Sequence, residues 1–590
     1  MTRRTRILGI VAAGALALTA CAGQGDGGST APTGDDTGTG EGTEAPAPER
    51  SGGVVRVAET NAFTSFNPNV GENNLDINSK ILGTMRSDFI YLDNELNIVP
   101  DTSFGTYEKI SDDPLKVKYT VNESSVWSDG NAIDKADMLL AWASMSGYFD
   151  SGEGEDAKVL FQYAGSTEGL GLTSMPEFED DRTMTLTYSE PYVDWEIAYS
   201  LAGMPAHVVA EKAGIDEAKL ADLIENGTKG EPGDELQKAA EFWNTGYVTK
   251  TMPSDESLLL SSGPMIVTDM VEDQSVSLGL NENYGGDLKP LIDEIDVKFI
   301  GDAAAQIADL RNGQVDIIAP QPTVDAVQQV TSIDGVEVLQ GSQLSYDHVD
   351  LSFDSEVFKD KNVREAFLKT IPRQQILDRL IKPINPDAEI VNSQLYLPSE
   401  GDLYTQAVAE NGSDAYAEVD IEGAKELLAG ATPTVRILYS SANPVRVDTF
   451  SMIQESASQA GFVIEDGGSE NWSSELGGGT YDASIFGWIS SGVGNAGVPQ
   501  LFSSNGGGNY SAYKNADVDA LAAKLMVATE SDEAESIKRQ IDTHLWSDAF
   551  GTPLFQGPGL IVHSDQIQGV EYMPNQTGVW WNFWEWSLAS

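Results

Sequence analysis

The residue types that most often carry out chemistry are rare and scattered in this chain of 590 residues. Its histidines show neither the H-x-x-x-H nor the H-E-x-x-H spacing of a metal-binding helix, and no G-x-S-x-G or C-x-x-C motif occurs. The four histidines are His207, His348, His544 and His563. The 92 acidic residues make chance pairs of carboxylates unavoidable, so such pairs do not indicate a hydrolase. We therefore predict no enzyme activity, no cofactor and no metal site.

Cys21 is the only cysteine, and its position indicates a covalent lipid. Three arginines precede an apolar run at residues 7–18, which is too short to span a bilayer and is typical of a signal peptide. The run leads to L-T-A-C at 18–21, which resembles the bacterial lipobox. We predict a signal peptide at 1–20 and lipidation of Cys21. The alternative is an ordinary cleavage site with an accidental cysteine.

Residues 21–53 are rich in Gly, Thr, Ser, Asp, Glu and Pro and contain almost no bulky apolar side chain. This composition predicts a disordered linker. Such a tether holds a globular body near a membrane-bound partner at high effective concentration. We expect the body on the extracellular face of the cell membrane, attached by lipid alone, as is typical of a Gram-positive or actinobacterial cell.

Beyond residue 53 the composition is that of a globular protein. Hydrophobic residues make up 41% of the chain, and no second apolar run is long enough to cross a membrane. More than 500 residues exceed what one hydrophobic core supports, so we expect two or three lobes with a ligand cleft between them. The net charge of −57 repels nucleic acid and disfavours self-association, which predicts a monomer that binds no nucleic acid.

Short β-branched segments alternate with helical patterns, which indicates an α/β or α+β architecture. We predict strands at 54–59, 117–121, 184–188, 275–280, 295–300, 315–318, 435–439 and 462–465. We predict helices at 135–146, 303–312, 363–379, 421–428, 447–460 and 517–527. Asp302 and Gly313 supply start and stop signals for one of these helices.

The most specific motif is W-S-D-G at 127–130. It favours a tight turn, because Asp129 can bond to its own backbone and Gly130 can adopt a positive φ. Asp134 can then cap the helix that follows, and Trp127 is expected in a core.

Further motifs follow W-S-D-G in a fixed order. They are S-G-P at 262–264, N-E-N-Y at 281–284, L-R-N-G-Q-V-D-I at 310–317, V-R-E-A-F at 363–367 with Arg373, A-K-E-L-L at 424–428, and Y-D to G-W at 481–488. Together they resemble the solute-binding proteins of the oligopeptide, dipeptide and nickel class that serve ABC importers. The resemblance runs from about residue 52 to the C-terminus. Pro372 stands where this family has an aspartate, and it predicts a kink in the helix.

The resemblance implies an α/β, bilobal fold of the type II periplasmic-binding-protein kind, with an extra subdomain on the first lobe. Lobe I is then discontinuous, with crossovers near Ser345 and Pro553. The implied boundaries are 54–88, 204–345 and 553–590 for lobe I, 89–203 for the extra subdomain, and 346–552 for lobe II.

The resemblance also implies where a ligand binds. In the peptide-binding branch, an acidic residue three positions after the G-W tryptophan pairs with the ligand's α-amino group. This chain has Ser491 there, so either another carboxylate supplies the charge or the ligand lacks a free amine. Family position predicts the ligand-binding residues Asn61, Phe63, Tyr346, Phe486, Trp488, Ser490, Ser491 and Asn495. For Phe63 and Phe486, core packing is an equally good interpretation.

The implied function is that of an importer's substrate-binding lipoprotein, which captures oligopeptides or dipeptides and delivers them to membrane permease subunits. An oligosaccharide or another non-peptide solute is the alternative cargo, and a secreted hydrolase is the second alternative. One branch of the family carries nickel, but no histidine cluster is found here. The C-terminal run W-W-N-F-W-E-W at 580–586 is interpreted as a final strand buried on both faces rather than a sugar-stacking platform.

Overall fold

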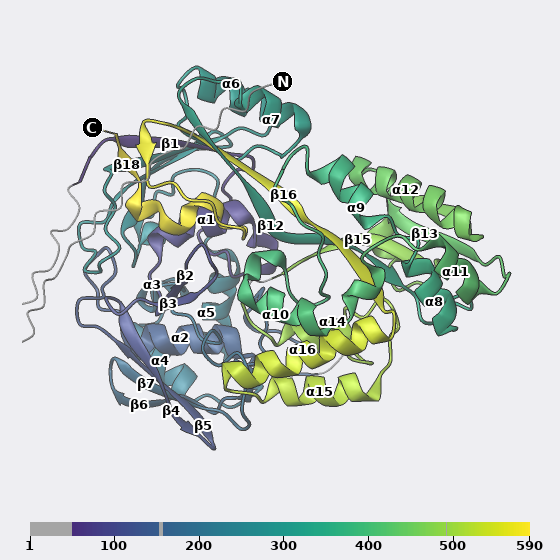
Figure 1. Cartoon of the computed structure of the whole chain (residues 1–590). Coiled ribbons are helices and arrows are strands. Elements are labelled where there is room, and N and C mark those ends of the chain that lie inside the picture. The colour runs from purple at the N-terminus through teal and green to yellow at the C-terminus, as the bar shows by residue number, and fades with distance from the viewer. Residues whose placement is uncertain (1–49, 153–156, 491–492, 590) are drawn as a thin grey trace, which may run out of the picture. The chain divides into compact units, whose positions relative to one another are not determined.

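A computed structural model of the chain describes residues 50–152, 157–490 and 493–589 (Figure 1). The predicted lipidation site Cys21 and the predicted ligand contact Ser491 lie outside these ranges. Within them, no helix combines the length and the apolar character needed to cross a bilayer.

A sheet of ten strands organises the body, in the order β14-β13-β15-β12-β16-β11-β1-β10-β9-β8. Its pairing is mixed, since β1 is parallel to β10 and β11, whereas β12 is antiparallel to β15 and β16. The strands are β1 (Val54–Glu59), β8 (Met265–Val271), β9 (Ser275–Leu280), β10 (Glu294–Phe299), β11 (Ile317–Ile318), β12 (Val336–Leu351), β13 (Thr434–Ser440), β14 (Val463–Ser469), β15 (Ala483–Ile489) and β16 (Gly551–Ser564).

Three smaller sheets complete the β structure. One has four strands in the order β4-β5-β7-β6, and the other two pair β2 with β3 and β17 with β18. Their strands are β2 (Ile90–Leu92), β3 (Ile98–Pro100), β4 (Gly105–Asp112), β5 (Leu115–Val121), β6 (Glu177–Asp180), β7 (Thr183–Thr187), β17 (Ile567–Gln568) and β18 (Ser587–Leu588). The four-stranded sheet falls inside the segment predicted to be an extra subdomain.

The helices lie around these sheets, with α14, α15 and α16 grouped together in Figure 1. Their bounds are α1 (Asp76–Met85), α2 (Lys135–Ser146), α3 (Ala206–Ala213), α4 (Glu217–Glu225), α5 (Asp234–Thr245), α6 (Ala303–Arg311), α7 (Val324–Val330), α8 (Lys361–Leu368), α9 (Arg373–Ile376), α10 (Asp402–Glu410), α11 (Ile421–Leu428), α12 (Pro444–Ala460), α13 (Trp472–Glu475), α14 (Gly497–Phe502), α15 (Ala516–Met526) and α16 (Ser531–Ser547).

The long strands β12 and β16 run side by side and pass from one hydrophobic core to another (Figure 1). Val349 of β12 and Phe555 of β16 pack in a core with α8, α11 and α12. Ile561 of β16 packs in the other large core, with β1, α1 and α2. The predicted lobe boundaries at Ser345 and Pro553 stay a prediction.

Local signals predicted many elements well. The helices at 135–146 and 421–428 and the strand at 275–280 have the predicted bounds. Asp134 accepts a hydrogen bond from the Ala136 backbone N–H and forms a capping box with Asp137. The predicted helix at 363–379 is interrupted before Arg373, because Pro372 is not helical, and it continues as α9 and a π-helical turn, η5 (Leu377–Ile381).

The C-terminal tryptophan run is a 3₁₀-helix, η8 (Gly578–Glu585), so its prediction as a strand was wrong. The helix is kinked at Asn582, and Trp586 follows it in an extended conformation, so the burial of Trp580, Phe583 and Trp586 comes from tertiary packing rather than from a strand's alternation. All three are buried. The Trp580 indole donates to Glu59 Oε1 at 2.7 Å, which fixes the run against β1. These side chains are therefore buried without forming a strand.

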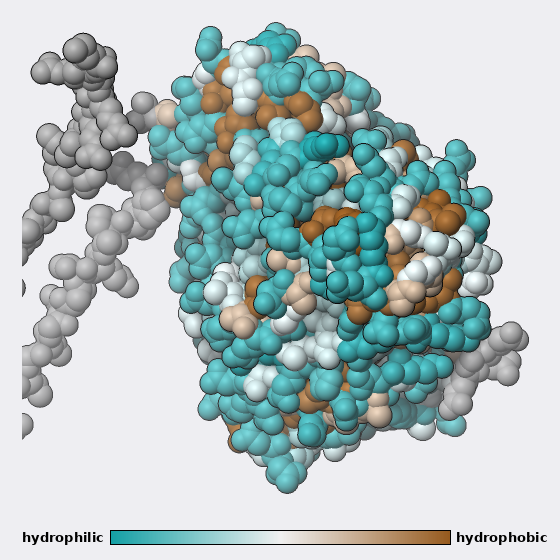
Figure 2. Space-filling view, turned by 45° about the vertical axis from the view of Figure 1, so that its right-hand side comes forward, coloured by the Kyte–Doolittle hydropathy of each residue, from teal (hydrophilic) through white to brown (hydrophobic). Residues whose placement is uncertain are grey.

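Hydrophilic residues cover most of the face drawn in Figure 2, and apolar residues gather there only in small separate patches.

Candidate functional site

The paired strands β12 and β15 place a row of ring-bearing side chains on one face of the large sheet. Tyr346 lies opposite Trp488, and His348 lies opposite Phe486. Asp350 follows two residues later on the same face, because successive strand residues alternate between faces. Asp347 points to the opposite face, where its carboxylate pairs with Arg446 through two contacts of 2.9 Å.

A cavity of about 770 Å³ lies over this face. Its walls come from segments far apart in the sequence, at 96–98, 163–198, 393–403, 488–490, 493–502 and 531–538, together with Tyr346. The volume lies in the range of small-ligand sites, roughly 300–1,000 Å³. Bringing these segments together requires the long strands β12 and β16, because they connect the parts of the chain that carry the walls.

The predicted ligand contacts divide into two groups. Tyr346, Trp488, Ser490 and Asn495 line the cavity. Phe486 is buried and does not line the cavity, and its ring centroid lies 5.4 Å from that of Trp488.

Asn61 and Phe63 do not line this cavity. Asn61 is exposed and donates to Asp76 at 3.1 Å. Phe63 is buried in the core, where its ring meets that of Phe66 edge-on at 4.9 Å. Core packing is the role that its surroundings support.

Aromatic side chains form a connected group at one end of the cavity. The Trp488 and Tyr510 rings are parallel within 7°, with centroids 6.0 Å apart. Phe486 meets His348 edge-on at 4.3 Å. Of these rings, Trp488 lines the cavity and can contact a bound molecule, whereas Phe486 and His348 are buried and support it.

Charged groups on the α16 side of the cavity are already paired. Glu535 and Lys538 form an ion pair of 3.0 Å, and both are largely buried. The Lys538 ammonium also lies 4.5 Å from the Tyr396 ring centroid, and the Tyr396 hydroxyl donates to Glu535 at 2.7 Å. Burial raises the pKa of the neighbouring Glu400 carboxyl, while Lys538 acts in the opposite direction.

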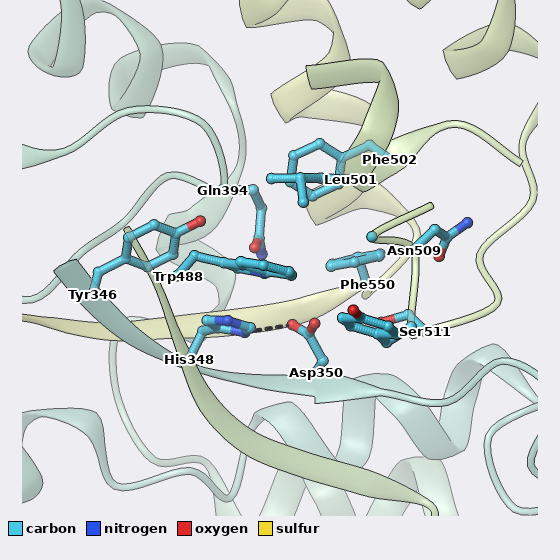
Figure 3. A pocket seen from close by; sticks show the side chains of 12 residues that line it. Tyr346, His348, Asp350, Gln394, Trp488, Leu501, Phe502, Asn509, Ser511 and Phe550 are labelled. Atoms are coloured by element: carbon cyan, nitrogen blue, oxygen red, sulfur yellow. Dashed lines mark hydrogen bonds and ion pairs between the residues drawn. The ribbon is translucent and has the colours of Figure 1, made fainter. Parts of the chain in front are cut away.

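A second, much smaller pocket of about 10 Å³ adjoins the cavity and shares Tyr346, Gln394, Trp488, Leu501 and Phe502 with it (Figure 3). On its floor, His348 Nδ1 lies 2.8 Å from Asp350 Oδ1. In the view of Figure 3, Asp350 lies between His348 and Ser511, with Trp488 above. The pocket has room for about one water-sized group.

His348, Asp350, Tyr510 and Ser511 line the small pocket but were not predicted as site residues from the sequence. A signal existed for the first two, because Tyr346, His348 and Asp350 are spaced two residues apart, as one face of a strand requires. The other two reach the site through a loop, whose path depends on tertiary contacts such as the Phe353 N–H donating to the Ser511 carbonyl at 2.8 Å.

Among the described residues, one group of three carboxylates lies close enough to share a cation: Asp134, Asp137 and Glu217. Asp137 accepts hydrogen bonds from the Ala206 and Asp134 backbone N–H groups, so its place in a helix cap accounts for its position. Burial raises the pKa of Asp137 to about 7. The group is not part of the cavity wall.

The chain resembles known binding proteins over nearly its whole length. The family model described as the middle region of bacterial extracellular solute-binding proteins, family 5, matches residues 102–510. An uncharacterized lipoprotein of Mycobacterium tuberculosis is 26% identical over 548 residues, covering 90% of this chain and 92% of the relative. The oligopeptide-binding protein OppA of the same species is 24% identical over 568 residues, covering 93% and 88%. The named relatives are binding proteins rather than enzymes.

Solved structures share the fold. The periplasmic EDTA-binding protein EppA superimposes with a TM-score of 0.74 at 21% identity, covering 92% of this chain and 98% of that protein. The oligopeptide-binding protein AppA of Bacillus subtilis, solved with a nonapeptide, gives 0.63 at 20% identity, covering 92% and 100%. The chain therefore belongs to the family 5 bacterial extracellular solute-binding proteins of ABC importers, and it has their mixed α/β, bilobal type II fold.

Proposed function

We propose that this chain is the lipid-anchored receptor of an ABC importer and that its cargo is an oligopeptide or a dipeptide. The observation that carries the proposal is the cavity of about 770 Å³, whose walls come from 96–98 and 163–198 on one side and from 393–403, 488–490, 493–502 and 531–538 on the other. A partly open space of this size, built from several separate chain segments, suits a small ligand that contacts several walls at once. We propose no catalytic role for the side chains that line it.

The cavity wall combines polar backbone with side chains of several kinds, which suits a peptide. A peptide backbone can contact polar residues near the end of β15, where Ser490 and Asn495 line the cavity. Its side chains can occupy the space between the aromatic residues. A site that holds the peptide backbone and leaves room for its side chains would accept many peptide sequences.

Contacts across the cavity support a closing mechanism. The Asp194 carboxylate accepts hydrogen bonds from the backbone N–H groups of Asn495 and Ala496, at 2.7 to 2.9 Å. Lys109 pairs with Glu530 at 2.5 Å. A ligand favours closure only when it makes more contacts in the closed state than in the open one. We propose that lobe I with its subdomain and lobe II, divided as the sequence predicts, close in this way.

We propose that the protein acts at the outer face of the cell membrane. Lipid on Cys21 would hold a monomeric body at the outer face of the membrane, where it meets the permease subunits. Replacing Cys21 with serine should move the protein from the membrane fraction to the culture medium and leave ligand binding by the body unchanged. A Cys21→Ser protein that stays in the membrane fraction would contradict lipid anchoring.

The cargo can be tested directly by native mass spectrometry of the purified protein, followed by a thermal-shift screen of dipeptides, longer peptides and oligosaccharides. A peptide mass, or stabilisation by peptides alone, is the expected result, because a ligand that binds only the folded state raises Tm. Stabilisation by oligosaccharides alone would favour the alternative cargo, for which the parallel Trp488 and Tyr510 rings are the supporting observation.

A further inference from the structure

We propose that a third pocket, next to the large cavity, is a separate compartment of the ligand site and takes an uncharged polar part of the ligand. It has a volume of about 420 Å³ and shares Ile489 and Ser490 with the large cavity. Its other walls come from β12 at 343–345 and from the loop at 574–577. We call it the neutral pocket. The inference rests on the proposed function, because the large cavity holds the rest of the ligand.

An irregularity in β12 forms one wall of the neutral pocket. The pairing of β12 with β16 shifts in register between Ser342 and Tyr346, where three residues of β12 lie opposite one residue of β16. A bulge of this kind bends the strand and redirects its side chains. The Leu344 N–H donates to the Pro574 carbonyl, and the Leu344 carbonyl accepts from the Ser490 N–H, both at 3.0 Å. These two bonds connect the three walls, which are the bulge, the residue after β15 and the loop at 574–577.

The charge of the lining distinguishes the neutral pocket from the large cavity. None of the described side chains that line the neutral pocket carries a formal charge. The large cavity, in contrast, is lined by Asp194, Glu400, Glu535 and Lys538. A charged ligand group in the neutral pocket would lose water without gaining a counter-charge, which is unfavourable. An uncharged polar group loses less, and it can form hydrogen bonds with the side-chain amides and hydroxyls of the lining.

Ile489 and Asn575 are suited to contact such a group. Ile489 is 61% exposed, more than any other exposed large hydrophobic side chain of the described residues. It lines both the neutral pocket and the large cavity, so a ligand that occupies both would cover it and bury apolar surface. Asn575 Oδ1 accepts from the Thr577 backbone N–H at 2.8 Å, which fixes the amide and leaves its two N–H donors out of this bond.

This chemistry favours a peptide segment with uncharged side chains. The amides of Gln343, Asn575 and Gln576 offer donors and acceptors that match those of a peptide backbone. Small or apolar ligand side chains can pack against Leu344 and Ile489. The hydroxyl groups of a neutral sugar have the same uncharged polar character, so the test includes an oligosaccharide.

The test is calorimetric titration of the purified protein with hexa-alanine, with three substituted series and with maltopentaose. In the three series each alanine in turn is replaced by glutamine, glutamate or lysine. The protein variants are Gln576→Glu, Gln576→Lys and Gln576→Trp, which should fold with unchanged Tm because Gln576 is exposed. Gln329→Glu and Gln329→Lys on α7 are matched controls, since Gln329 is also exposed and is not among the described residues that line either space.

We expect hexa-alanine to bind. At one position, or at adjacent positions, glutamate and lysine should each weaken binding about fivefold or more, whereas glutamine should have little effect. At that position Gln576→Glu should improve binding of the lysine peptide and weaken binding of the glutamate peptide, by about threefold each. Gln576→Lys should do the reverse. The two Gln329 variants should change neither preference, which separates a local effect from that of net charge.

Equal tolerance of glutamine, glutamate and lysine at every position would overturn the neutral compartment and leave the peptide cargo standing. So would a charge preference that neither Gln576→Glu nor Gln576→Lys changes. Binding of maltopentaose alone, weakened tenfold or more by Gln576→Trp, would support the compartment and overturn the peptide cargo. Binding of maltopentaose alone that Gln576→Trp leaves unchanged, or failure of every probe to bind the wild-type protein, would overturn both.

Discussion

Trp488 and Phe63 were both predicted to contact the ligand, but their surroundings suggest different roles. Trp488 is partly exposed and faces the cavity, whereas Phe63 is buried against Phe66. Replacing Trp488 with alanine should reduce affinity for the best-binding peptide by about tenfold, since aromatic contacts and their buried area are worth roughly 1–3 kcal/mol. Titration calorimetry measures this effect.

Phe63→Ala is the control, because it should lower the stability of the protein and leave its affinity for the ligand unchanged. Truncating a buried phenylalanine destabilises by about 3–5 kcal/mol, so its Tm should fall by several degrees or more. Its affinity, measured at a temperature at which the variant is folded, should match the wild type. A large affinity loss in Phe63→Ala with unchanged Tm would assign Phe63 to the ligand site instead.

Asp542 connects α16 to the segment that carries Gln394. Its carboxylate accepts hydrogen bonds from the Ser393 hydroxyl, the Gln394 backbone N–H and the Asn411 amide, each at 2.8 Å. Burial nevertheless raises the pKa of Asp542 to about 6. Three donors around one carboxylate hold Gln394 at the edge of both the cavity and the small pocket.

The raised pKa of Asp542 gives its contribution to stability a definite sign. An unfolded aspartate has a pKa of about 3.9, so between about pH 4 and 6 the folded state keeps a proton that the unfolded state has released. This contribution to the free energy of unfolding therefore falls as pH rises through that window, by about 1.4 kcal/mol per unit of pKa difference.

Asp542→Asn should have a lower Tm near neutral pH, because an amide nitrogen cannot accept from the surrounding donors. Its Tm should also fall less than that of the wild type between about pH 4.5 and 7, since the titrating group is gone. Calorimetric Tm values over this range test both effects, with Asp269→Asn as the control, because Asp269 is exposed on β8. If Tm changed with pH in Asp542→Asn as steeply as in the wild type, the titration of Asp542 would not be the cause of that pH dependence.

At the scale of the element, α14 begins at the point where two distant segments meet. Asp194 accepts from the Asn495 and Ala496 backbone N–H groups just before this helix. The Trp195 indole donates to the Thr529 carbonyl at 3.2 Å, beside the start of α16. These contacts connect the segment at 89–203 to the α14–α16 group.

Asp194→Ala should therefore favour an open form. We expect weaker ligand binding and a larger radius of gyration by X-ray scattering in the presence of ligand, because closure loses charge-assisted hydrogen bonds. Asp302→Ala is a matched control, since Asp302 caps α6 through the Ala305 N–H at 2.8 Å, away from the cavity. Each variant loses a hydrogen-bonding carboxylate, but only Asp194→Ala should change affinity. Equal affinities would contradict a role in closure.

Elements with local signals were predictable, and elements that depend on distant partners were not. The helix at 135–146 has its Asp134 cap at one end and Gly147 in the left-handed region at the other, so its bounds followed from the sequence. The 16 residues of β12 include Gly341 and several polar side chains. Their pairing is with β15 and β16, more than 130 residues away, so local sequence does not reveal this strand.

The same distinction applies to the site. The G-W motif identified Trp488, and family position identified Tyr346 opposite it. His348 and Asp350 share the face of Tyr346, but the register of β12 against β15 is needed to place them near Trp488. Ser511 comes from a loop that tertiary contacts hold, and no spacing in the sequence points to it. The C-terminal run was predicted as a strand buried on both faces, but it is a 3₁₀-helix in which Trp581 and Trp584 are half-buried and Glu585 is exposed.

At the scale of the whole molecule, the net charge of −57 lowers the stability of the folded body, because its acidic side chains repel one another. Many ion pairs are exposed, such as Lys425 with Glu422 at 2.8 Å, and pairs of this kind contribute only about 0–1 kcal/mol. Added salt weakens these pairs slightly, but it screens the much more numerous unpaired acidic residues as well. Repulsion should therefore dominate the response to salt.

We expect Tm near neutral pH to rise when NaCl increases from about 10 to 200 mM, since the Debye length falls from about 30 Å to below 10 Å over this range. The internal control is pH. Near the sequence isoelectric point of about 4.1 the net charge is close to zero, so the same salt increase should leave Tm nearly unchanged. A Tm that falls with salt near neutral pH would show that the ion pairs, rather than the excess of acidic residues, determine the electrostatic balance of the folded body.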